Sequence, residues 1–174
     1  QNNTIDNHTS YGLYIRSYDY DTYTFEIKNN SITNNVTGIY CSNGESYNTI
    51  TYNNCWNNSS SNYSGSLPTG TGNLTDINAN GTVSDVYYNI SEYPLYIDQV
   101  NGDFSLQVGS PNIDAGDPAD TDLDGTVSDI GAFVFLQNVA IISVSPSSID
   151  FGSVNIGDSD TTSVTITSAG TIDL

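Results

Sequence analysis

The chain has 174 residues, and its 2 Lys and Arg side chains against 20 Asp and Glu give a formal net charge of −18. This charge excludes nucleic acids and anionic membranes as favourable partners. Hydrophobic residues make up 36% of the chain, and no apolar stretch approaches the about 18 residues of a membrane-spanning helix. We therefore expect a folded, acidic protein without membrane insertion. The start at Gln1, without a signal peptide, predicts a processed or excised piece of a longer protein.

Most of the polarity comes from Asn, Ser, Thr, Gly and Tyr rather than from charged residues. Asn and Ser compete locally for backbone hydrogen bonds and so disfavour helix interiors, whereas Thr and Tyr pack well on pleated strands. The composition therefore predicts an all-β fold.

Short repeats occupy the first part of the chain. The segments 3–6, 30–33 and 48–51 each have Asn, a hydroxyl residue, Ile and a polar residue in that order. A glycine-led strand follows the first two copies, at 12–15 and 38–40, and Trp56 lies near that place in the third. A repeat of about 20 residues with two or three short strands is typical of a solenoid.

Such repeats favour a right-handed parallel β-helix over residues 1–65, with Ile5, Ile32 and Ile50 stacked inside and asparagine amides hydrogen-bonded from turn to turn. The segment 30–40 resembles the turns of the pectate-lyase-like superfamily of right-handed β-helices. That resemblance implies an extracellular setting in which many relatives act on polysaccharides.

Residues 66–136 lack the repeat and are expected to close the β-helix as a cap. Two alternating runs, 95–98 and 104–108, flank the turn sequence Asn101-Gly102-Asp103, which predicts a hairpin. The segments 110–118 and 120–133 resemble the C-terminal end of surface β-helix proteins of the choice-of-anchor Q type. This resemblance implies secretion and display on the surface of a bacterium or archaeon, and no catalytic role.

Alternating carboxylates in this closing segment predict a calcium site. Three aspartates at alternate positions precede Gly125, which permits a sharp turn, and oxygen ligands suit a hard cation. The Glu that completes a full EF-hand loop is missing, because Gly131 occupies its position. Asp129 or Asp117 could supply the carboxylate instead. The predicted ligands of Ca²⁺ are Asp120, Asp122, Asp124, Thr126 and Asp129. The alternative is a solvated acidic turn.

From residue 137 to 174 the strands alternate and are separated by turns at Ser147-Ser148 and Gly157-Asp158. The segments 149–152 and 168–171 resemble the opening of the abnormal-spindle/Hydin type of immunoglobulin-like domain. Because such a sandwich needs about 100 residues, the resemblance implies a truncated immunoglobulin-like β-sandwich.

Aromatic side chains suggest a carbohydrate surface. Tyr18, Tyr20, Tyr23 and Trp56 could stack on sugar rings, and the alternative is a set of half-buried loop aromatics. Cys41 and Cys55 either form one disulfide or are two small buried residues.

Two functions remain open from the sequence. The first is a non-catalytic, monomeric part of a secreted or cell-surface β-helix protein, structural or adhering to a polysaccharide or cell-surface glycan. The second is the C-terminal portion of an extracellular polysaccharide lyase or glycoside hydrolase with its active site upstream. Arg16 and Lys28 are the sole Lys and Arg residues, which leaves few bases for lyase chemistry and favours the first.

Overall fold

Strands form nearly all of the regular structure, as the composition predicts. The computed structural model describes residues 1–16, 25–42, 49–137 and 142–168. The chain divides into two compact units, Gln1–Phe135 and Leu136–Leu174. The one helical element in these described ranges is a 3-10 turn, η1 (Gln99–Asn101), and no helix there is long and apolar enough to cross a membrane. The all-β prediction is confirmed.

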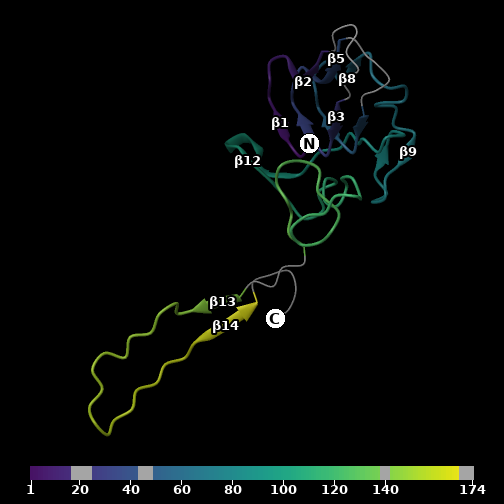
Figure 1. Cartoon of the computed structure of the whole chain (residues 1–174). Coiled ribbons are helices and arrows are strands. Elements are labelled where there is room, and N and C mark those ends of the chain that lie inside the picture. The colour runs from purple at the N-terminus through teal and green to yellow at the C-terminus, as the bar shows by residue number, and fades with distance from the viewer. Residues whose placement is uncertain (17–24, 43–48, 138–141, 169–174) are drawn as a thin grey trace. The chain divides into compact units, whose positions relative to one another are not determined.

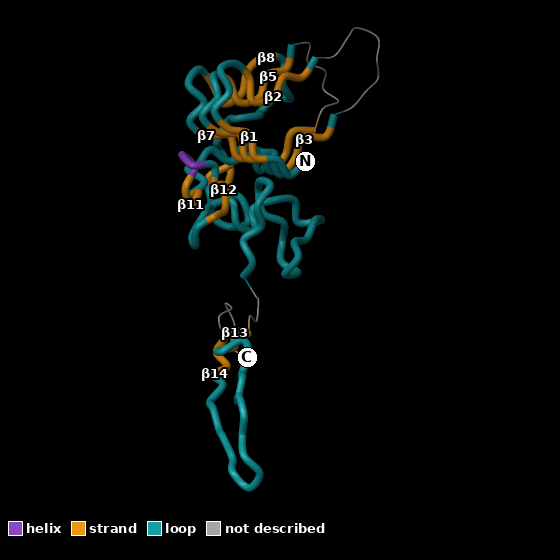
Figure 2. Tube along the Cα trace, turned by 90° about the vertical axis from the view of Figure 1, so that its left-hand side faces the viewer, coloured by secondary structure: helices purple, strands orange, loops and turns teal. Residues whose placement is uncertain are grey.

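Eight short strands in the first 65 residues form three sheets in which all pairings are parallel (Figure 1). The first sheet has the order β1 (Thr4–Asp6), β4 (Ser31–Thr33) and β7 (Asn54–Trp56), the second has β2 (Tyr11–Ile15), β5 (Thr37–Cys41) and β8 (Ser61–Gly65), and the third pairs β3 (Glu26–Lys28) with β6 (Thr49–Thr51). The chain therefore passes through the three sheets in a fixed order and then begins again. Figure 2 shows β2, β5 and β8 side by side.

The register of these sheets corrects the predicted alignment of the repeats. Ile5 pairs with Ile32 as predicted, but Ile32 then pairs with Cys55 rather than with Ile50. Ile50 belongs to the third sheet, where its partner is Ile27. The prediction that the segment 48–51 is the third copy is therefore wrong: Cys55 occupies the place that isoleucine has in the first two copies.

The apolar core lies between the three sheets and is built from inward residues of β2 to β7, of which β5 contributes two, Ile39 and Cys41. Ile32 is fully buried and Ile50 is 1% exposed, which confirms their predicted positions, whereas Ile5 is half-buried. The remaining buried members of this core are Ile15, Ile27, Ile39, Cys41 and Cys55. Each side chain contacts neighbours from the preceding and following strands, so the core depends on repetition of the unit.

Glycine opens the second sheet for a steric reason. A Cβ atom on Gly12 would lie 2.5 Å from Cγ2 of Ile32, and one on Gly38 would lie 2.4 Å from the Asn62 carbonyl oxygen. The third strand of that sheet has Asn62 in the equivalent position. The prediction that Trp56 lies near this place in the third copy is wrong, because Trp56 ends β7 of the first sheet.

A ladder of asparagine side chains runs along one turn of the stack, as predicted. The Nδ2 atom of Asn3 donates to Oδ1 of Asn30 (2.9 Å), Asn30 donates likewise to Asn53 (2.8 Å), and Asn53 to Asn89 (2.9 Å). The last amide, of Asn89, donates to both carboxyl oxygens of Asp85 (3.2 and 3.0 Å). Because Asn30, Asn53 and Asn89 are buried, each amide satisfies polar groups that would otherwise be costly to bury.

A second ladder occupies the next turn. Asn35 donates to Asn58 (3.0 Å) and Asn58 donates to Asn62 (2.8 Å), all through Nδ2 and Oδ1. The backbone N–H of His8 donates to Oδ1 of Asn35 (3.0 Å), so His8 joins the ladder through its backbone.

The segment after residue 65 packs against the outer side of the first sheet and extends it. Ile90 pairs in parallel with Asn54 next to β7. The hydroxyl groups of Tyr96 and Ser31 lie 2.6 Å apart, and Asn112 accepts from Nδ2 of Asn54 at 2.6 Å. A second small core of Ile90, Ala115 and Ile130 forms there.

The hairpin predicted in this segment is present. Strand β11 (Tyr96–Asp98) pairs antiparallel with β12 (Asp103–Leu106) across η1, and Gly102 has the positive φ of 83° that this turn requires. A shorter antiparallel pair joins β9 (Asp76–Ile77) to β10 (Val83–Ser84).

The second unit contains one antiparallel pair among its described residues. Strand β13 (Ile142–Ser145) pairs with β14 (Thr165–Ser168), close to the two strands expected at its ends. The turn at Gly157-Asp158 is present, where the N–H of Asp158 donates to the Asn155 carbonyl (3.0 Å). Residues 146–164 form no strand, so the strand expected between the turns at Ser147-Ser148 and Gly157-Asp158 is absent.

Candidate functional site

The acidic loop of the first unit is a tight, internally bonded turn. Thr121 and Val127 form an antiparallel bridge, and the N–H of Gly125 donates to the Asp122 carbonyl (3.1 Å). The carboxylate of Asp124 accepts from both the N–H and the hydroxyl of Thr126 (3.1 and 2.7 Å). Gly125 has a φ of 84°, which explains why the turn needs glycine.

The loop closes on a buried carboxyl group. Asp129 is 2% exposed and accepts from the N–H groups of Asp114 (2.8 Å) and Phe135 (2.6 Å). Burial raises the pKa of Asp129 to about 6, and the charges of Asp122 and Asp114 add to this effect. The pKa of Asp122 is raised too, by burial and by the nearby Asp124 and Asp114, although its Oδ2 accepts from the Asp129 N–H (2.7 Å).

Asp120 faces a different partner from the rest of the predicted calcium ligands. The Lys28 ammonium lies 3.0 Å from Asp120 and 2.9 Å from Asp117, and the Nδ2 atom of Asn29 donates to Asp120 (3.2 Å). The hydrogen bonds that Lys28 donates to these two carboxylates raise its pKa. The pKa of Asp117 is lowered, first by the hydrogen bond from the Ala119 N–H and then by the one from Lys28. Within the described ranges, no three Asp, Glu, His or Cys side chains converge on a point that could hold a metal ion. Calcium binding therefore stays a prediction.

The predicted glycan surface is described in part. Tyr18, Tyr20 and Tyr23 lie outside the described residues. Trp56 is half-buried and packs against Tyr93, with ring centroids 4.9 Å apart.

Two other aromatic groups were missed by sequence reasoning. Tyr11, Tyr14 and Tyr40 form one cluster on β2 and β5, where the rings of Tyr14 and Tyr40 are stacked at 5.4 Å and Tyr14 is 47% exposed. The other group is Tyr52 and Tyr88, stacked at 5.2 Å with an interplanar angle of 17°. The sequence signal for the first cluster is the pair of glycine-led segments 12–15 and 38–40. Their parallel pairing aligns Tyr14 with Tyr40.

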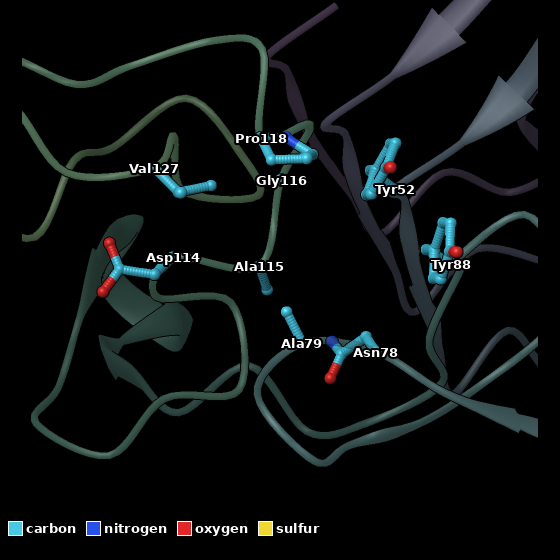
Figure 3. Close-up of a pocket in the computed structure, with 9 residues that line it drawn as sticks. All are labelled: Tyr52, Asn78, Ala79, Tyr88, Asp114, Ala115, Gly116, Pro118 and Val127. Carbon is cyan, nitrogen blue, oxygen red and sulfur yellow. The ribbon is translucent and has the colours of Figure 1, made fainter.

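The pair Tyr52 and Tyr88 borders a small cavity of about 100 Å³ (Figure 3). The remaining lining residues are Asn78, Ala79, Asp114, Ala115, Gly116, Pro118 and Val127. The cavity thus lies between the last turns of the strand stack and the closing segment, and we call it the tyrosine pocket.

Cys41 and Cys55 are not joined by a disulfide, and both are fully buried in the core. Burial raises the pKa of the Cys55 thiol to about 12, which suits an unreactive core residue.

Comparison of the chain with models of protein families, with curated proteins and with solved structures finds no match.

Proposed function

We propose that this chain is the non-catalytic end of a right-handed parallel β-helix that is secreted or displayed on a cell surface, where it acts as a structural element and adheres to glycans. The observation that carries the proposal is the order in which the chain visits its sheets. From β1 to β8 it passes through the first, second and third parallel sheets and repeats that order. This order is the one expected of a β-helix and supports that architecture.

The energetics of the stack support a structural role. Inward isoleucines and two asparagine ladders link each turn to the next, so the polar and apolar contacts both run along the stack. Repeated nearest-neighbour contacts of this kind make a stiff, extendable body. Stiffness is the property required of a spacer on a cell surface.

The state of Lys28 supports the absence of lyase chemistry in this chain. A proton-abstracting lysine needs a lowered pKa, but the two carboxylates beside Lys28 raise its pKa. The side chain is 11% exposed and lies between the strand stack and the acidic loop. Lys28 therefore links the strand stack to the acidic loop through ion pairs.

Exposed tyrosines support the glycan-adhering part of the proposal. The rings of Tyr11, Tyr14 and Tyr40 form a surface cluster on the second sheet, and ring faces of tyrosine fit the apolar faces of pyranoses. A neutral glycan suits this surface, because a net charge of −18 repels polyuronates.

Two further parts of the proposal concern the remaining segments. We propose that the acidic loop binds Ca²⁺ through the predicted ligands Asp120, Asp122, Asp124, Thr126 and Asp129, which would draw together around the ion. Besides burial, neighbouring carboxylates help to raise the pKa values of Asp122 and Asp129, and a bound cation would relieve that repulsion. The second unit is proposed to be the opening part of an immunoglobulin-like domain, supported by its antiparallel strand pair.

The proposal is tested by incubating the chain with a panel of neutral and acidic polysaccharides. We expect no new reducing ends and no unsaturated products, together with weak binding of neutral glycans detected by a change in tyrosine and tryptophan fluorescence. Turnover that disappears in Arg16→Ala would overturn the non-catalytic function and favour a polysaccharide lyase. The matched control is His8→Ala, an exposed side chain on the same first turn of the stack.

A further inference from the structure

Three unusual features meet at the tyrosine pocket: strained backbone at two tyrosines, a buried asparagine side chain, and an amide donor of that asparagine that has no partner among the described residues. The two tyrosines occupy backbone positions that normally exclude them. Tyr52 has a φ of 54° and Tyr88 a φ of 62°, in the left-handed region that bulky residues rarely adopt.

The asparagine ladder identifies what these two positions usually hold. Each ladder residue Asn3, Asn30, Asn53 and Asn89 is preceded by a residue with positive φ, and these residues are, in order, Asn2, Asn29, Tyr52 and Tyr88. Asparagine tolerates this conformation because its short side chain can hydrogen-bond locally. Two successive turns therefore carry tyrosine where the fold itself favours asparagine. Non-glycine residues held in this region cluster at ligand clamps.

The replacement brings the two rings together. Their centroids lie 5.2 Å apart and their planes are nearly parallel, so they form a continuous aromatic wall. Tyr88 is 41% exposed, which leaves part of this wall open to a ligand.

One side-chain amide donor in the lining of the pocket has no partner among the described residues. Asn78 is 8% exposed, and its Nδ2 atom has no hydrogen-bond partner among the described residues. Its Oδ1 atom accepts from the backbone N–H groups of Asn80 (3.1 Å) and Thr82 (2.9 Å). Rotating the amide by 180° would break both bonds, so the orientation of Nδ2 is fixed. In Figure 3 the oxygen of Asn78 is turned away from the two tyrosines and the nitrogen lies on the side of Ala79.

The rest of the lining is mostly small and apolar. Ala79, Ala115, Pro118 and Val127 contribute to it. Asp114 also belongs to the lining, but in Figure 3 its carboxyl group points away from Ala115 and from the two tyrosines. A cavity of about 100 Å³ is well below the about 300–1,000 Å³ of a pocket that encloses a whole ligand. It therefore accepts one functional group of a ligand whose body stays at the rim.

We propose that the tyrosine pocket binds the acetamido group of an N-acetylated sugar in a neutral glycan. The methyl group would fill the apolar part, the carbonyl oxygen would accept from Nδ2 of Asn78, and the pyranose ring would lie against the wall of Tyr52 and Tyr88. A sugar hydroxyl fits less well, because it would bring a further donor into an apolar cavity. This inference deepens the glycan-adhering part of the proposed function and rests on it.

The test is a titration of the ¹⁵N-labelled whole chain with the methyl glycoside of N-acetylglucosamine, followed by NMR. We expect the side-chain amide signals of Asn78 and the backbone signals of Ala79 and Ala115 to shift, with a dissociation constant in the millimolar range. The methyl glycoside of glucose should bind about tenfold more weakly. Equal shifts with both sugars, or shifts confined to Trp56 and Tyr93, would overturn the proposal.

Two variants examine the donor and the wall separately. Asn78→Asp keeps a side-chain oxygen that accepts from the N–H groups of Asn80 and Thr82 but removes the amide donor. It should weaken binding by about tenfold or more. Tyr88→Ala should weaken it by about 3- to 10-fold. The control is Tyr93→Ala, a tyrosine of similar exposure (42%) that lies outside the pocket, and it should leave the affinity unchanged. Unshifted signals of the buried Ile39 in each variant show that the fold is retained; wild-type affinity in Asn78→Asp would overturn the assignment.

An N-acetyl-lysine amide is the last arm of the test, because its acetamide group has the same chemistry without a sugar ring. Binding as tight as that of N-acetylglucosamine would show that the tyrosine wall adds nothing and would overturn the saccharide assignment. Failure of all these titrations, with polysaccharide binding intact, would reject the pocket and leave the proposed function in place. Polysaccharide turnover would instead reject the proposed function.

Discussion

Both units of the chain contain strands in which apolar and polar residues alternate, but the first unit buries far more of its apolar side chains than the second. In the first unit, the isoleucines of β4, β5 and β6 are buried, and the asparagine ladders satisfy the polar groups between them. In the second unit all residues from 142 to 167 are exposed, and Ile166 in β14 is 62% exposed. An alternating strand thus gains stability only when further strands supply the other side of a core. The first unit obtains those strands by repetition.

The largest effect is expected from truncating a core residue of the first unit. Ile32→Ala should lower the free energy of unfolding by about 2–5 kcal/mol, because it leaves a cavity between two turns of the stack. Ile166→Ala in the second unit should change it by less than about 0.5 kcal/mol. Urea denaturation followed by fluorescence of Trp56, the one tryptophan, measures the first effect, and circular dichroism of the backbone, to which both units contribute, measures the second. Equal effects would contradict the difference in burial.

Calcium should stabilise the first unit selectively. At a calcium concentration one hundred times the dissociation constant, mass action adds about 2.7 kcal/mol to the stability. Thermal unfolding with calcium and with chelator should differ, and Asp122→Ala should abolish the difference. The matched control is Asp150→Ala in the second unit, which should retain it. Identical melting curves for the wild type would reduce the loop to a solvated turn.

Breaking the asparagine ladder should cost less than the core cavity. Asn53→Ala removes the acceptor of two hydrogen bonds from Asn30 (3.0 and 2.8 Å) and leaves buried donors unsatisfied, at a cost of about 1–3 kcal/mol. Asn155→Ala, an exposed asparagine of the second unit, should have almost no effect. Hydrogen exchange of the amides in β4 and β7 would locate the loss, and unchanged exchange there would show that the ladder does not stabilise the stack.

The smallest effect is a dependence on pH that belongs to the first unit. The pKa of Asp129 is about 6 in the folded chain and about 3.9 in an unfolded one. The folded state therefore binds more protons between these values, and stability rises as the pH falls. Between pH 7 and pH 5, in chelator, we expect a gain of about 1 kcal/mol, to which Asp122 adds in the same direction. Asp129→Asn should flatten this profile, and a loss of stability over this range would contradict the raised pKa.

The sequence predicted the all-β class, the buried Ile32 and Ile50, and the hydrogen-bonded asparagines. The prediction of the third repeat was wrong. The hydrogen-bonded asparagine in the turn fixes the register of the strands, whereas the inward position held by Ile32 in one strand is held by Cys55 in the next. Counting from Asn30 to Asn53 rather than from Ile32 to Ile50 would have given the correct step.

The tyrosine pocket was missed for a related reason. Tyr52 and Tyr88 are ordinary polar-aromatic residues in the sequence, and their unusual backbone conformation becomes visible once the ladder aligns them with Asn2 and Asn29. The cavity also requires Asn78 and Val127, which are brought together by packing of the non-repeating segment. No periodicity encodes that contact.

The asparagine ladder has a direction, and Asp85 determines where it ends. The Nδ2 atom of each ladder asparagine donates to the next side-chain oxygen. The carboxyl group of Asp85 only accepts, from Asn89, from the Tyr87 N–H (2.8 Å) and from the Gly72 N–H (2.7 Å). Asp85 is fully buried and has no amide donor to extend the series. With no donor to pass on, the carboxyl group of Asp85 completes the series of side-chain hydrogen bonds inside the protein, so that the ladder offers no amide at this point to a further strand.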